Sequence, residues 1–244
     1  MKDELGRRIN YLRISVTDRC NLRCRYCMPA EGIDKKEHNE MLTLEEIFEV
    51  VKTCAELGTD KIRITGGEPL VRKGLTGLVE KISKLDQIKD IAVTTNGILL
   101  KEYAYDLKNA GLKRINISLD TMKKDRYEYM TRGGNISDVF EGIDEALASG
   151  LAPIRINTVL IKGFNEDEIE DFLKLTLKEN IDVRFIELMP LGQAGEWATE
   201  HYISNDAVLE KFKELEPAED IDRSSPAKYY KLPGAKGRVG LINT

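Results

Sequence analysis

Histidine, tryptophan and cysteine are scarce in this chain, with 2, 1 and 4 residues respectively among 244. The formal net charge is −5, so the chain as a whole lacks the basic surface that nucleic-acid-binding proteins need. No apolar run approaches the roughly 20 residues of a membrane-spanning helix, and the start, MKDELGRR, lacks the apolar segment of a signal peptide. We therefore expect a cytoplasmic protein that binds neither nucleic acid nor a membrane.

Three of the four cysteines, Cys20, Cys24 and Cys27, lie close together near the start of the chain. This grouping does not fit a disulfide framework in a chain of this size, and it favours a reducing compartment. The fourth, Cys54, stands at helical spacing from apolar neighbours such as Val51. We expect it to be a buried core thiol.

Strand-like and helix-like segments alternate along the chain, as in repeated βα units. Strands are expected near 8–17, 61–66, 90–96, 113–120, 153–161 and 182–189. Helices are expected near 43–58, 73–85, 99–110, 135–150, 165–180 and 203–215. Thr43 and Glu46 form the pattern of a capping box before the first helix. Three of the predicted helices are each followed by a glycine in the C′ position: Gly58, Gly111 and Gly150.

The predicted strands carry one apolar and one polar face. In 61–65, for example, Ile62 and Ile64 alternate with Lys61 and Arg63. A parallel strand covered by helices on both faces would be apolar almost throughout, and a closed eight-stranded barrel packs its interior with branched apolar side chains. The pattern therefore predicts an α/β fold in the form of an incomplete, open parallel β/α barrel of about six βα units, with a polar ligand inside.

The cysteine segment DRCNLRCRYC has the spacing C-x3-C-x2-C and follows the first predicted strand. Three thiolates on one loop can hold three irons of a [4Fe–4S] cubane and leave the fourth iron open, whereas electron-transfer cubanes have four cysteine ligands. An open iron can bind the amino and carboxylate groups of a methionine moiety. Structural zinc is the alternative, but it needs four ligands, and neither His38 nor His201 has zinc-finger spacing to this loop.

The cysteine motif, followed by Gly66-Gly67-Glu68-Pro69 at the end of the second predicted strand, resembles the radical SAM superfamily. The longer strings RISVTDRCNLRCRYCMP, KIRITGGEPL, TTNG, NISLD and RFIELM resemble one branch of it, the MoaA family. This family contains the GTP 3′,8-cyclases of molybdenum-cofactor (molybdopterin) biosynthesis. The resemblance extends from about Arg13 to the last residue, and it implies an open barrel of the radical SAM type.

The resemblance assigns a cofactor site. It implies that Cys20, Cys24 and Cys27 ligate one [4Fe–4S] cluster whose open iron binds S-adenosylmethionine (SAM). The residues that would contact SAM are Tyr26, Gly66, Gly67, Glu68, Ser118 and Met189. Glycine at position 67 lets the main chain approach the ligand closely. Ser118 and Met189 have an ordinary alternative, because a serine or methionine at a strand end usually only packs.

The same resemblance assigns a GTP site to Arg13, Lys61, Arg63, Thr94, Arg155 and Arg184, and it counts Arg184 as catalytic together with the cysteines. Arg13, Arg63 and Arg155 lie on the polar faces of three predicted strands, and guanidiniums that share one interior need counter-charge. A triphosphate supplies that charge through bidentate contacts, whereas ion pairs with Asp or Glu are the alternative. The family usually has Lys at the position of Arg155, so the charge is kept while its reach differs.

The implied enzyme is a radical SAM lyase. SAM would be cleaved to methionine and a 5′-deoxyadenosyl radical, which would abstract hydrogen from C3′ of GTP before the sugar radical attacks C8 of guanine. The product would be (8S)-3′,8-cyclo-7,8-dihydroguanosine 5′-triphosphate. The alternatives are a radical SAM enzyme for another substrate such as a peptide, a form that only cleaves SAM, and a non-catalytic iron–sulfur or zinc protein.

The regular βα pattern ends near Gly192, so we expect a radical SAM partial barrel in residues 1–190 and a C-terminal extension in residues 191–244. Family members continue after a match to GRVGLIN into a second C-x2-C…C motif that holds a second [4Fe–4S] cluster. This chain has no cysteine after Cys54, so we expect it to be truncated before that motif. The resemblance also implies a low-potential electron donor and a homodimer.

Overall fold

The computed structural model describes residues 4, 6–7, 9–33, 40–190, 195–219 and 226–243. Within it the chain forms two compact units. The first unit consists of Met1–Asn21, Asp34–Asn116 and Ser137–Ala152, and the second of Leu22–Ile33, Ile117–Ile136 and Pro153–Thr244. Three parts of the sequence-based prediction lie outside the described residues: residue 8 of the first strand, His38, and residues 191–194, 220–225 and 244 of the extension.

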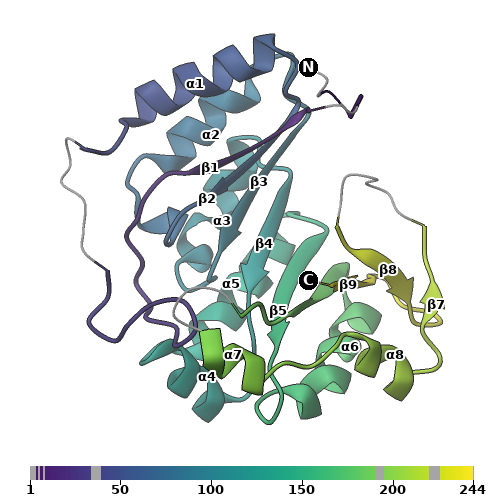
Figure 1. Cartoon of the computed structure of the whole chain (residues 1–244). Coiled ribbons are helices and arrows are strands. Elements are labelled where there is room, and N and C mark those ends of the chain that lie inside the picture. Colours follow the sequence, from purple (N-terminus) through teal and green to yellow (C-terminus); the bar gives the residue numbers. More distant parts are fainter. Residues whose placement is uncertain are drawn as a thin grey trace. The chain divides into compact units, whose positions relative to one another are not determined.

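The first unit contains the strands β1 (Tyr11–Ser15), β2 (Lys61–Thr65) and β3 (Asp90–Thr95). β1 pairs with β2, and β2 with β3, in parallel. The helices that follow these strands in turn are α1 (Leu44–Glu56), α2 (Leu75–Ser83) and α3 (Leu100–Asn109), and the short 3-10 helix η2 (Pro69–Val71) precedes α2. α1 and α2 lie side by side (Figure 1). α5 (Ile136–Ala148) lies almost entirely in this unit.

β4 (Arg114–Ser118) begins in the first unit and ends in the second. The second unit holds β5 (Ile154–Leu160), β6 (Ile181–Glu187) and β9 (Val239–Ile242), which pair in parallel in that order. β8 (Lys228–Lys231) pairs antiparallel with β9 and with β7 (Glu216–Pro217). The helices of this unit are α4 (Lys124–Thr131), η3 (Glu166–Glu168), α6 (Ile169–Lys178), α7 (Gly195–Glu200) and α8 (Asp206–Lys211).

The hydrogen-bonded strand order is β1-β2-β3-β4-β5-β6-β9-β8-β7. The strands β1 to β6 follow one another in chain order with helical connections, which is the βα repeat that the sequence predicts. The order has two ends, β1 and β7, so the sheet is open. The prediction of an α/β fold with an open, mainly parallel sheet is confirmed.

The capping box predicted before the first helix is present at the start of α1. Thr43 Oγ1 accepts a hydrogen bond from Glu46 N at 3.2 Å, and the Glu46 carboxylate accepts one from Thr43 N at 2.7 Å. Ile47 and Val51 are buried on the inner face of the helix. Gly58, which follows the helix, has a φ of 103°, the left-handed backbone that a C′ residue needs.

Some local features differ from the sequence-based expectations. The first strand is shorter than predicted and covers only Tyr11–Ser15. α4 and α7 are not predicted, because α4 has little amphipathic periodicity and α7 is only 6 residues long. Cys54 is half-buried and not fully buried, and its apolar helix neighbour Val50 is 46% exposed. In this helix the apolar residues cover a wider part of the surface than the face that is buried in the unit.

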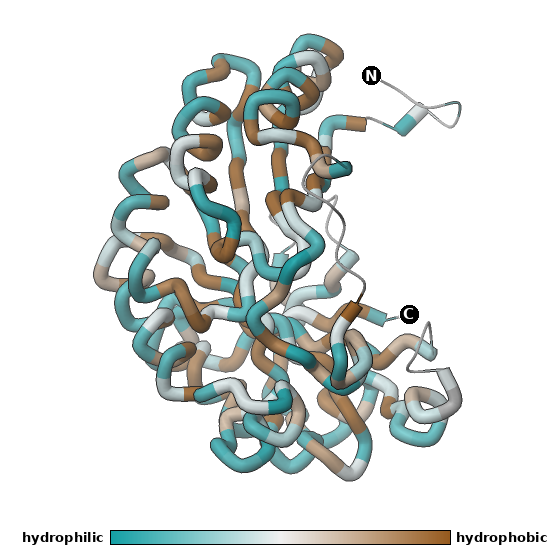
Figure 2. Tube along the Cα trace, turned by 90° about the vertical axis from the view of Figure 1, so that its left-hand side faces the viewer, coloured by the Kyte–Doolittle hydropathy of each residue, from teal (hydrophilic) through white to brown (hydrophobic). Residues whose placement is uncertain are grey.

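Buried apolar side chains form the interior of each unit. In β2, buried Ile62 and Ile64 alternate with partly exposed Lys61 and Arg63, as the pattern predicts. Hydrophobic and hydrophilic stretches also alternate along the helices (Figure 2), which is expected where one helical face is buried. No described helix combines the length and the hydrophobicity that crossing a membrane requires.

Candidate active site

Two adjacent glycines end β2 and bring its backbone against the segment that precedes Cys20. A Cβ at Gly66 would clash with the backbone of Thr17, and one at Gly67 would clash with the backbone of Arg19, so only glycine fits at both positions. The Gly67 N–H donates to Thr17 O at 2.7 Å, and the Glu68 N–H donates to Arg19 O at 2.8 Å. The end of β2 thereby sets the course of the main chain toward Cys20.

The buried carboxylate of Glu68 ties the end of β2 to the end of β3. Its Oε1 accepts hydrogen bonds from Thr95 Oγ1 at 2.7 Å and from Leu70 N at 3.0 Å. Its Oε2 accepts one from Asn96 N at 2.6 Å. Burial raises the pKa of Glu68, and these hydrogen bonds oppose the increase because they favour the ionised form. Both oxygens therefore have protein donors, and a contact of Glu68 with SAM stays a prediction.

Asn96 connects this group of hydrogen bonds to the first cysteine of the motif. Its Nδ2 lies 3.9 Å from Cys20 Sγ and donates to Asn21 Oδ1 at 2.7 Å. Its Oδ1 accepts a hydrogen bond from Ile98 N at 3.1 Å, which determines the orientation of the amide. The amide N–H group of Asn96 therefore faces the sulfur of Cys20.

Cys20 belongs to the first unit, whereas Cys24 and Cys27 belong to the second. The chain turns between the latter two, because Cys27 N donates to Cys24 O at 2.9 Å and Met28 N donates to the same oxygen at 3.1 Å. None of the three forms a disulfide; Cys20 and Cys24 are half-buried and Cys27 is exposed. Among the described residues, no three His, Cys, Asp or Glu side chains are grouped as in a metal site, so cluster ligation stays a prediction.

Tyr26, between Cys24 and Cys27, is anchored by a buried aspartate. Its hydroxyl donates to Asp120 Oδ2 at 2.7 Å, and Val159 N donates to Asp120 Oδ1 at 2.9 Å. Burial, followed by the negative charge of Asp120, raises the pKa of Tyr26 well above its usual value. The hydroxyl therefore stays protonated and acts as the donor, and Tyr26 is held against Asp120, two positions after the end of β4.

Two arginines lie side by side on the polar face of the β1–β2 pair. Arg13 and Arg63 are register partners, so their side chains leave the two strands on the same face. Arg13 is exposed, whereas Arg63 is half-buried, and its guanidinium lies 5.5 Å from the ring of Tyr11. Among the described residues, the buried Nε of Arg63 has no hydrogen-bond partner. Burial lowers the pKa of Arg63, and the charges of Arg114 and Arg13 lower it further.

The other predicted GTP residues of the first unit share this face. Lys61 stands two residues before Arg63 in β2, and side chains two residues apart in a strand point the same way. Arg63 is the register partner of Ala92, so Thr94 of β3 also lies on that face. The first unit therefore brings Arg13, Lys61, Arg63 and Thr94 together on one surface of its three strands.

In the second unit, Arg155 lies in a buried cluster of two arginines and one aspartate. Arg155 is 7% exposed, and its Nε lies 3.7 Å from Asp182 Oδ2. Asp182 accepts its hydrogen bonds from Arg238, at 2.7 Å from Nη2 and 3.0 Å from the backbone N. The ion-pair alternative for Arg155 is therefore only partly realised, because Asp182 makes its hydrogen bonds with Arg238 and the buried Nε of Arg155 has no hydrogen-bond partner among the described residues.

Arg184 lies on the same face of the β5–β6 pair as Arg155. The register pairs Arg155 with Asp182 and Asn157 with Arg184. The two pairs are two residues apart along the strands, so their side chains lie on the same face of the sheet. Arg184 is 3% exposed, and its Nε donates to Asn157 Oδ1 at 2.8 Å. A Cβ at Gly240 of β9 would lie 2.9 Å from Arg184 Cγ, so the glycine makes room for the arginine side chain.

Two further predicted SAM residues lie at strand ends of the second unit. Ser118 is exposed at the end of β4, and Met189 is 48% exposed shortly after β6. The carboxyl ends of parallel strands are where ligands of open α/β sheets bind. The positions therefore suit a ligand, and the individual contacts stay predictions.

Four residues that organise the site lie outside the sequence-based prediction: Asn96, Asp120, Asp182 and Arg238. Asn96 and Asp120 are the last residues of the predicted strands 90–96 and 113–120, so a polar residue at the carboxyl end of a predicted parallel strand is the signal that could have found them. Asp182 and Arg238 carry no such signal, because their pairing joins positions 56 residues apart in the sequence.

Two known protein families match this chain, and together they cover most of its length. Residues 14–176 match the family described as "Radical SAM superfamily". Residues 181–244 match the family described as "Molybdenum Cofactor Synthesis C". The first match covers more than half of the chain, so the class of protein is radical SAM.

Curated relatives define the family more closely. The GTP 3′,8-cyclase of Alkaliphilus oremlandii (strain OhILAs) is 60% identical over 243 residues, which cover 100% of this chain and 76% of that protein. The GTP 3′,8-cyclase of Peptoclostridium acidaminophilum is 62% identical over 242 residues, which cover 99% of this chain and 74% of that protein. The chain belongs to the GTP 3′,8-cyclase family of radical SAM proteins.

Solved structures share the fold. The crystal structure of methylornithine synthase (PylB) has a TM-score of 0.66 at 16% identity and covers 83% of this chain and 61% of that one. The crystal structure of Streptococcus suis SuiB bound to S-adenosylmethionine has a TM-score of 0.62 at 20% identity and covers 72% of this chain and 40% of that one. At these identities the likeness concerns the fold alone.

Proposed function

We propose that this chain is a GTP 3′,8-cyclase of molybdenum-cofactor biosynthesis. It converts GTP and SAM into (8S)-3′,8-cyclo-7,8-dihydroguanosine 5′-triphosphate, 5′-deoxyadenosine and methionine. The observation that carries this proposal is the identity of 60% and 62% to two GTP 3′,8-cyclases over nearly the whole chain. The match to the Molybdenum Cofactor Synthesis C family over residues 181–244 supports the same assignment.

The cysteine residues suit a [4Fe–4S] cluster held by Cys20, Cys24 and Cys27. None of the three is in a disulfide and all are at least partly accessible, and thiolates are the ligands that such clusters take. When bound together with SAM, the cluster supplies a 5′-deoxyadenosyl radical that can abstract a hydrogen atom from a sugar carbon. The Asn96 amide donates toward Cys20 Sγ and so helps to orient this ligand. Ligands for a second cluster are not among the cysteines of this chain.

The chain's own groups bind SAM in our proposal. The Gly67 N–H already donates to Thr17, so its carbonyl oxygen is the group that accepts from the SAM amino group. Gly66 and Glu68 hold this strand end in place, and the ring of Tyr26 lies beside the ligand. Two contacts complete the SAM site: the Ser118 hydroxyl binds the ribose, and Met189 contacts the adenine.

Basic side chains bind GTP. In the first unit, Arg13 and Arg63 point from one face with Lys61, and a triphosphate relieves the repulsion between these cations. Thr94 adds a hydroxyl on that face. In the second unit, a phosphate oxygen can accept from the buried Nε of Arg155, which has no hydrogen-bond partner among the described residues. Arg184, oriented by Asn157, contacts the reacting nucleotide as a catalytic residue.

We assign residues 1–190 to the partial barrel and residues 191–244 to the C-terminal extension. The enzyme acts as a homodimer and takes its electrons from a low-potential donor, one to cleave SAM and one to reduce the cyclised radical. It works in the cytoplasm, where four cysteines that form no disulfide would stay reduced. Sedimentation analysis tests the dimer directly.

Anaerobic reconstitution tests the function. The protein is loaded with iron and sulfide and incubated with SAM, dithionite and GTP, and 5′-deoxyadenosine and GTP-derived products are quantified. We expect a cyclic GTP product with the wild type and none with Cys24→Ala. Absence of 5′-deoxyadenosine from a protein with an intact cluster would contradict radical SAM chemistry. Formation of 5′-deoxyadenosine that GTP does not change, without a cyclic product, would contradict GTP as the substrate.

A further inference from the structure

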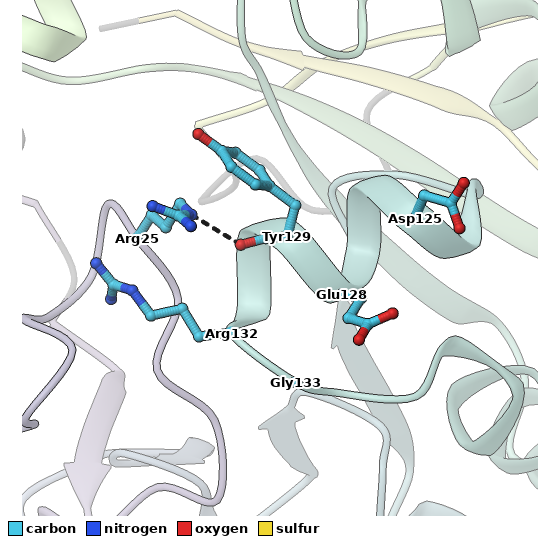
Figure 3. A pocket seen from close by; sticks show the side chains of 6 residues that line it. All are labelled: Arg25, Asp125, Glu128, Tyr129, Arg132 and Gly133. Atoms are coloured by element: carbon cyan, nitrogen blue, oxygen red, sulfur yellow. Dashed lines mark hydrogen bonds between the residues drawn. The ribbon is translucent and has the colours of Figure 1, made fainter.

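A cavity of about 570 Å³ in the second unit lies where the cysteine loop meets the end of α4 (Figure 3). The cysteine loop is here the segment Arg23–Met28, which contains Cys24 and Cys27. The residues that line the cavity are Arg25, Asp125, Glu128, Tyr129, Arg132 and Gly133. Arg25 comes from the cysteine loop, and the other residues come from α4 and the two positions that follow it.

Backbone hydrogen bonds attach the loop to the last turn of α4. Arg23 N donates to Thr131 O at 3.1 Å, and Arg25 N donates to Met130 O at 2.9 Å. Carbonyl groups in the last turn of a helix lack partners within the helix, so they are available as acceptors. The two bonds stand on either side of Cys24.

The side chain of Arg25 adds a contact in the same direction. Its Nε donates to Tyr129 O at 2.8 Å, and its guanidinium lies 3.9 Å from the centre of the Tyr129 ring. Figure 3 shows this hydrogen bond as the dashed line between the loop and the helix. The cation–π contact and the hydrogen bond together hold the middle of the loop against α4.

Arg132 makes the complementary contact from the helix end to the loop. Its Nη1 donates to Arg23 O at 2.7 Å and to Met28 O at 2.8 Å. Arg23 and Met28 stand at the two ends of the cysteine loop, so one guanidinium closes the loop around both Cys24 and Cys27. Hydrogen bonds from a charged donor are roughly twice as strong as neutral ones.

The backbone of Arg132 supports a specific role for its side chain. Its φ is 56°, and it is the only non-glycine residue with a positive φ in the described part of the chain. Arg132 ends α4, with its N–H donated to Glu128 O. Glycine is the usual residue at a left-handed helix end, because any side chain there is strained. An arginine at this position therefore requires a reason beyond ending the helix.

We propose that Arg132 is the positioning residue that holds the cysteine loop in the conformation in which Cys24 and Cys27 bind the cluster. This inference rests on the proposed function, because it takes these two cysteines as cluster ligands. Without the guanidinium, the loop keeps its backbone bonds to α4 but loses the contact that joins its two ends. The cluster is then held less firmly, although the protein still folds.

Substitution by glycine separates this role from that of ending the helix. Arg132→Gly keeps the left-handed backbone without strain and removes only the side chain. Arg132→Lys keeps a cationic donor that can reach carbonyl oxygens, so it should restore part of the effect. Glu128→Gln is the matched control, since Glu128 lines the same cavity but points away from Arg25 and Arg132 in Figure 3.

The experiment compares these three variants with the wild type under anaerobic conditions. Thermal unfolding of each apo protein is recorded first, and the reconstituted proteins are then assayed for iron and sulfide, for the rate of iron release to a chelator, and for the electron paramagnetic resonance spectrum of the reduced cluster. For Arg132→Gly we expect an unchanged or higher apo melting temperature, an altered spectrum and roughly tenfold faster iron release. Arg132→Lys should lie between it and the wild type, and Glu128→Gln should match the wild type.

Iron release and a spectrum equal to those of the wild type in Arg132→Gly would overturn the proposal. So would an equal acceleration of iron release in Glu128→Gln. If Arg132→Gly fails to fold, Arg132→Gln provides the same comparison with the same two outcomes. A wild type that assembles no cluster would overturn the proposed function itself, and this result is distinct from a cluster that Arg132 does not influence.

Discussion

Buried carboxylates organise the polar residues of each unit. Glu68 joins two strand ends of the first unit, and Asp120 in the second unit anchors Tyr26. Asp182 in the second unit faces Arg155 and Arg238. A buried carboxylate needs several donors to offset its lost hydration, so removing one donor or changing the acceptor has a measurable cost.

At the residue scale, Tyr26→Phe would leave Asp120 Oδ2 buried without its donor. We expect the free energy of unfolding of the apo protein to fall by about 1–3 kcal/mol, the usual cost of a buried polar group that loses its partner. In a double-mutant cycle with Asp120→Asn, the coupling energy should be about 1 kcal/mol. Urea unfolding of the four proteins measures it, and strictly additive effects would contradict a direct interaction.

Glu68→Gln places an amide NH2 group where a carboxylate oxygen now accepts hydrogen bonds. In either orientation of the amide, the donors of Glu68 lose an acceptor: Asn96 N in one case, Thr95 Oγ1 and Leu70 N in the other. We expect a loss of about 1–3 kcal/mol in the free energy of unfolding near neutral pH. Unchanged stability of the variant in urea would show that these bonds are dispensable.

The stability difference between the wild type and Glu68→Gln should also depend on pH. The folded-state pKa of Glu68 is raised by burial above its unfolded value, so between the two pKa values the folded state binds more protons. The resulting stabilisation is fully present below the unfolded pKa and is lost as pH rises through the folded pKa. The wild type should therefore gain stability relative to the variant as pH falls from 7 toward about 4.5. A difference that stays constant or shrinks over this range would contradict the raised pKa.

At the element scale, local signals explain which helices the sequence predicts well. α1 has a capping box, a buried face and a C′ glycine, and each acts over only a few residues. α4 lacks a side-chain hydrogen bond at its N-cap and is followed by the left-handed Arg132, so it depends on contacts to the cysteine loop. Such contacts between distant segments are not visible in local sequence patterns.

Thr43→Ala tests the contribution of the capping box to α1. The substitution removes the acceptor for Glu46 N, and we expect a loss of about 1 kcal/mol in the free energy of unfolding. Thr53→Ala in the same helix is the control, because Thr53 Oγ1 only donates back to Glu49 O and its removal should be nearly neutral. Urea unfolding of both variants provides the comparison, and equal losses would contradict the capping role.

At the scale of the whole molecule, the net charge of −5 contrasts with a proposed anionic substrate. Local register resolves the contrast: Arg13 and Arg63 stand next to each other on one face of the first unit, and Lys61 shares that face. Like charges at neighbouring strand positions repel, so a bound polyanion stabilises this face. This stabilisation by a bound polyanion should be measurable as an effect of GTP on the thermal unfolding of the whole chain.

GTP should therefore raise the melting temperature of the protein. At a GTP concentration 100 times its Kd, the stabilisation is about 2.7 kcal/mol, which in a chain of this size corresponds to a shift of about 5–10 °C. Arg63→Met should lose most of the shift. Lys81→Met removes an exposed cation of the same unit that pairs with Glu45, and it should keep the full shift. Scanning calorimetry measures all three proteins, and equal shifts in both variants would contradict a GTP contact at Arg63.

The sequence alone determined the features that depend on local chemistry and strand periodicity. The cysteine spacing, the two glycines after β2, the capping box and the alternation of β2 are properties of short segments, and the same strings identified the family. Only the tertiary structure decided which side chains hold these segments in place. Four sets of contacts join positions far apart in the sequence. They are those of Asn96 with Cys20, of Asp120 with Tyr26, of Arg238 with Asp182, and of Arg132 with both ends of the cysteine loop. Strand register and helix termination bring those positions together, and both are consequences of packing that no short stretch of sequence encodes.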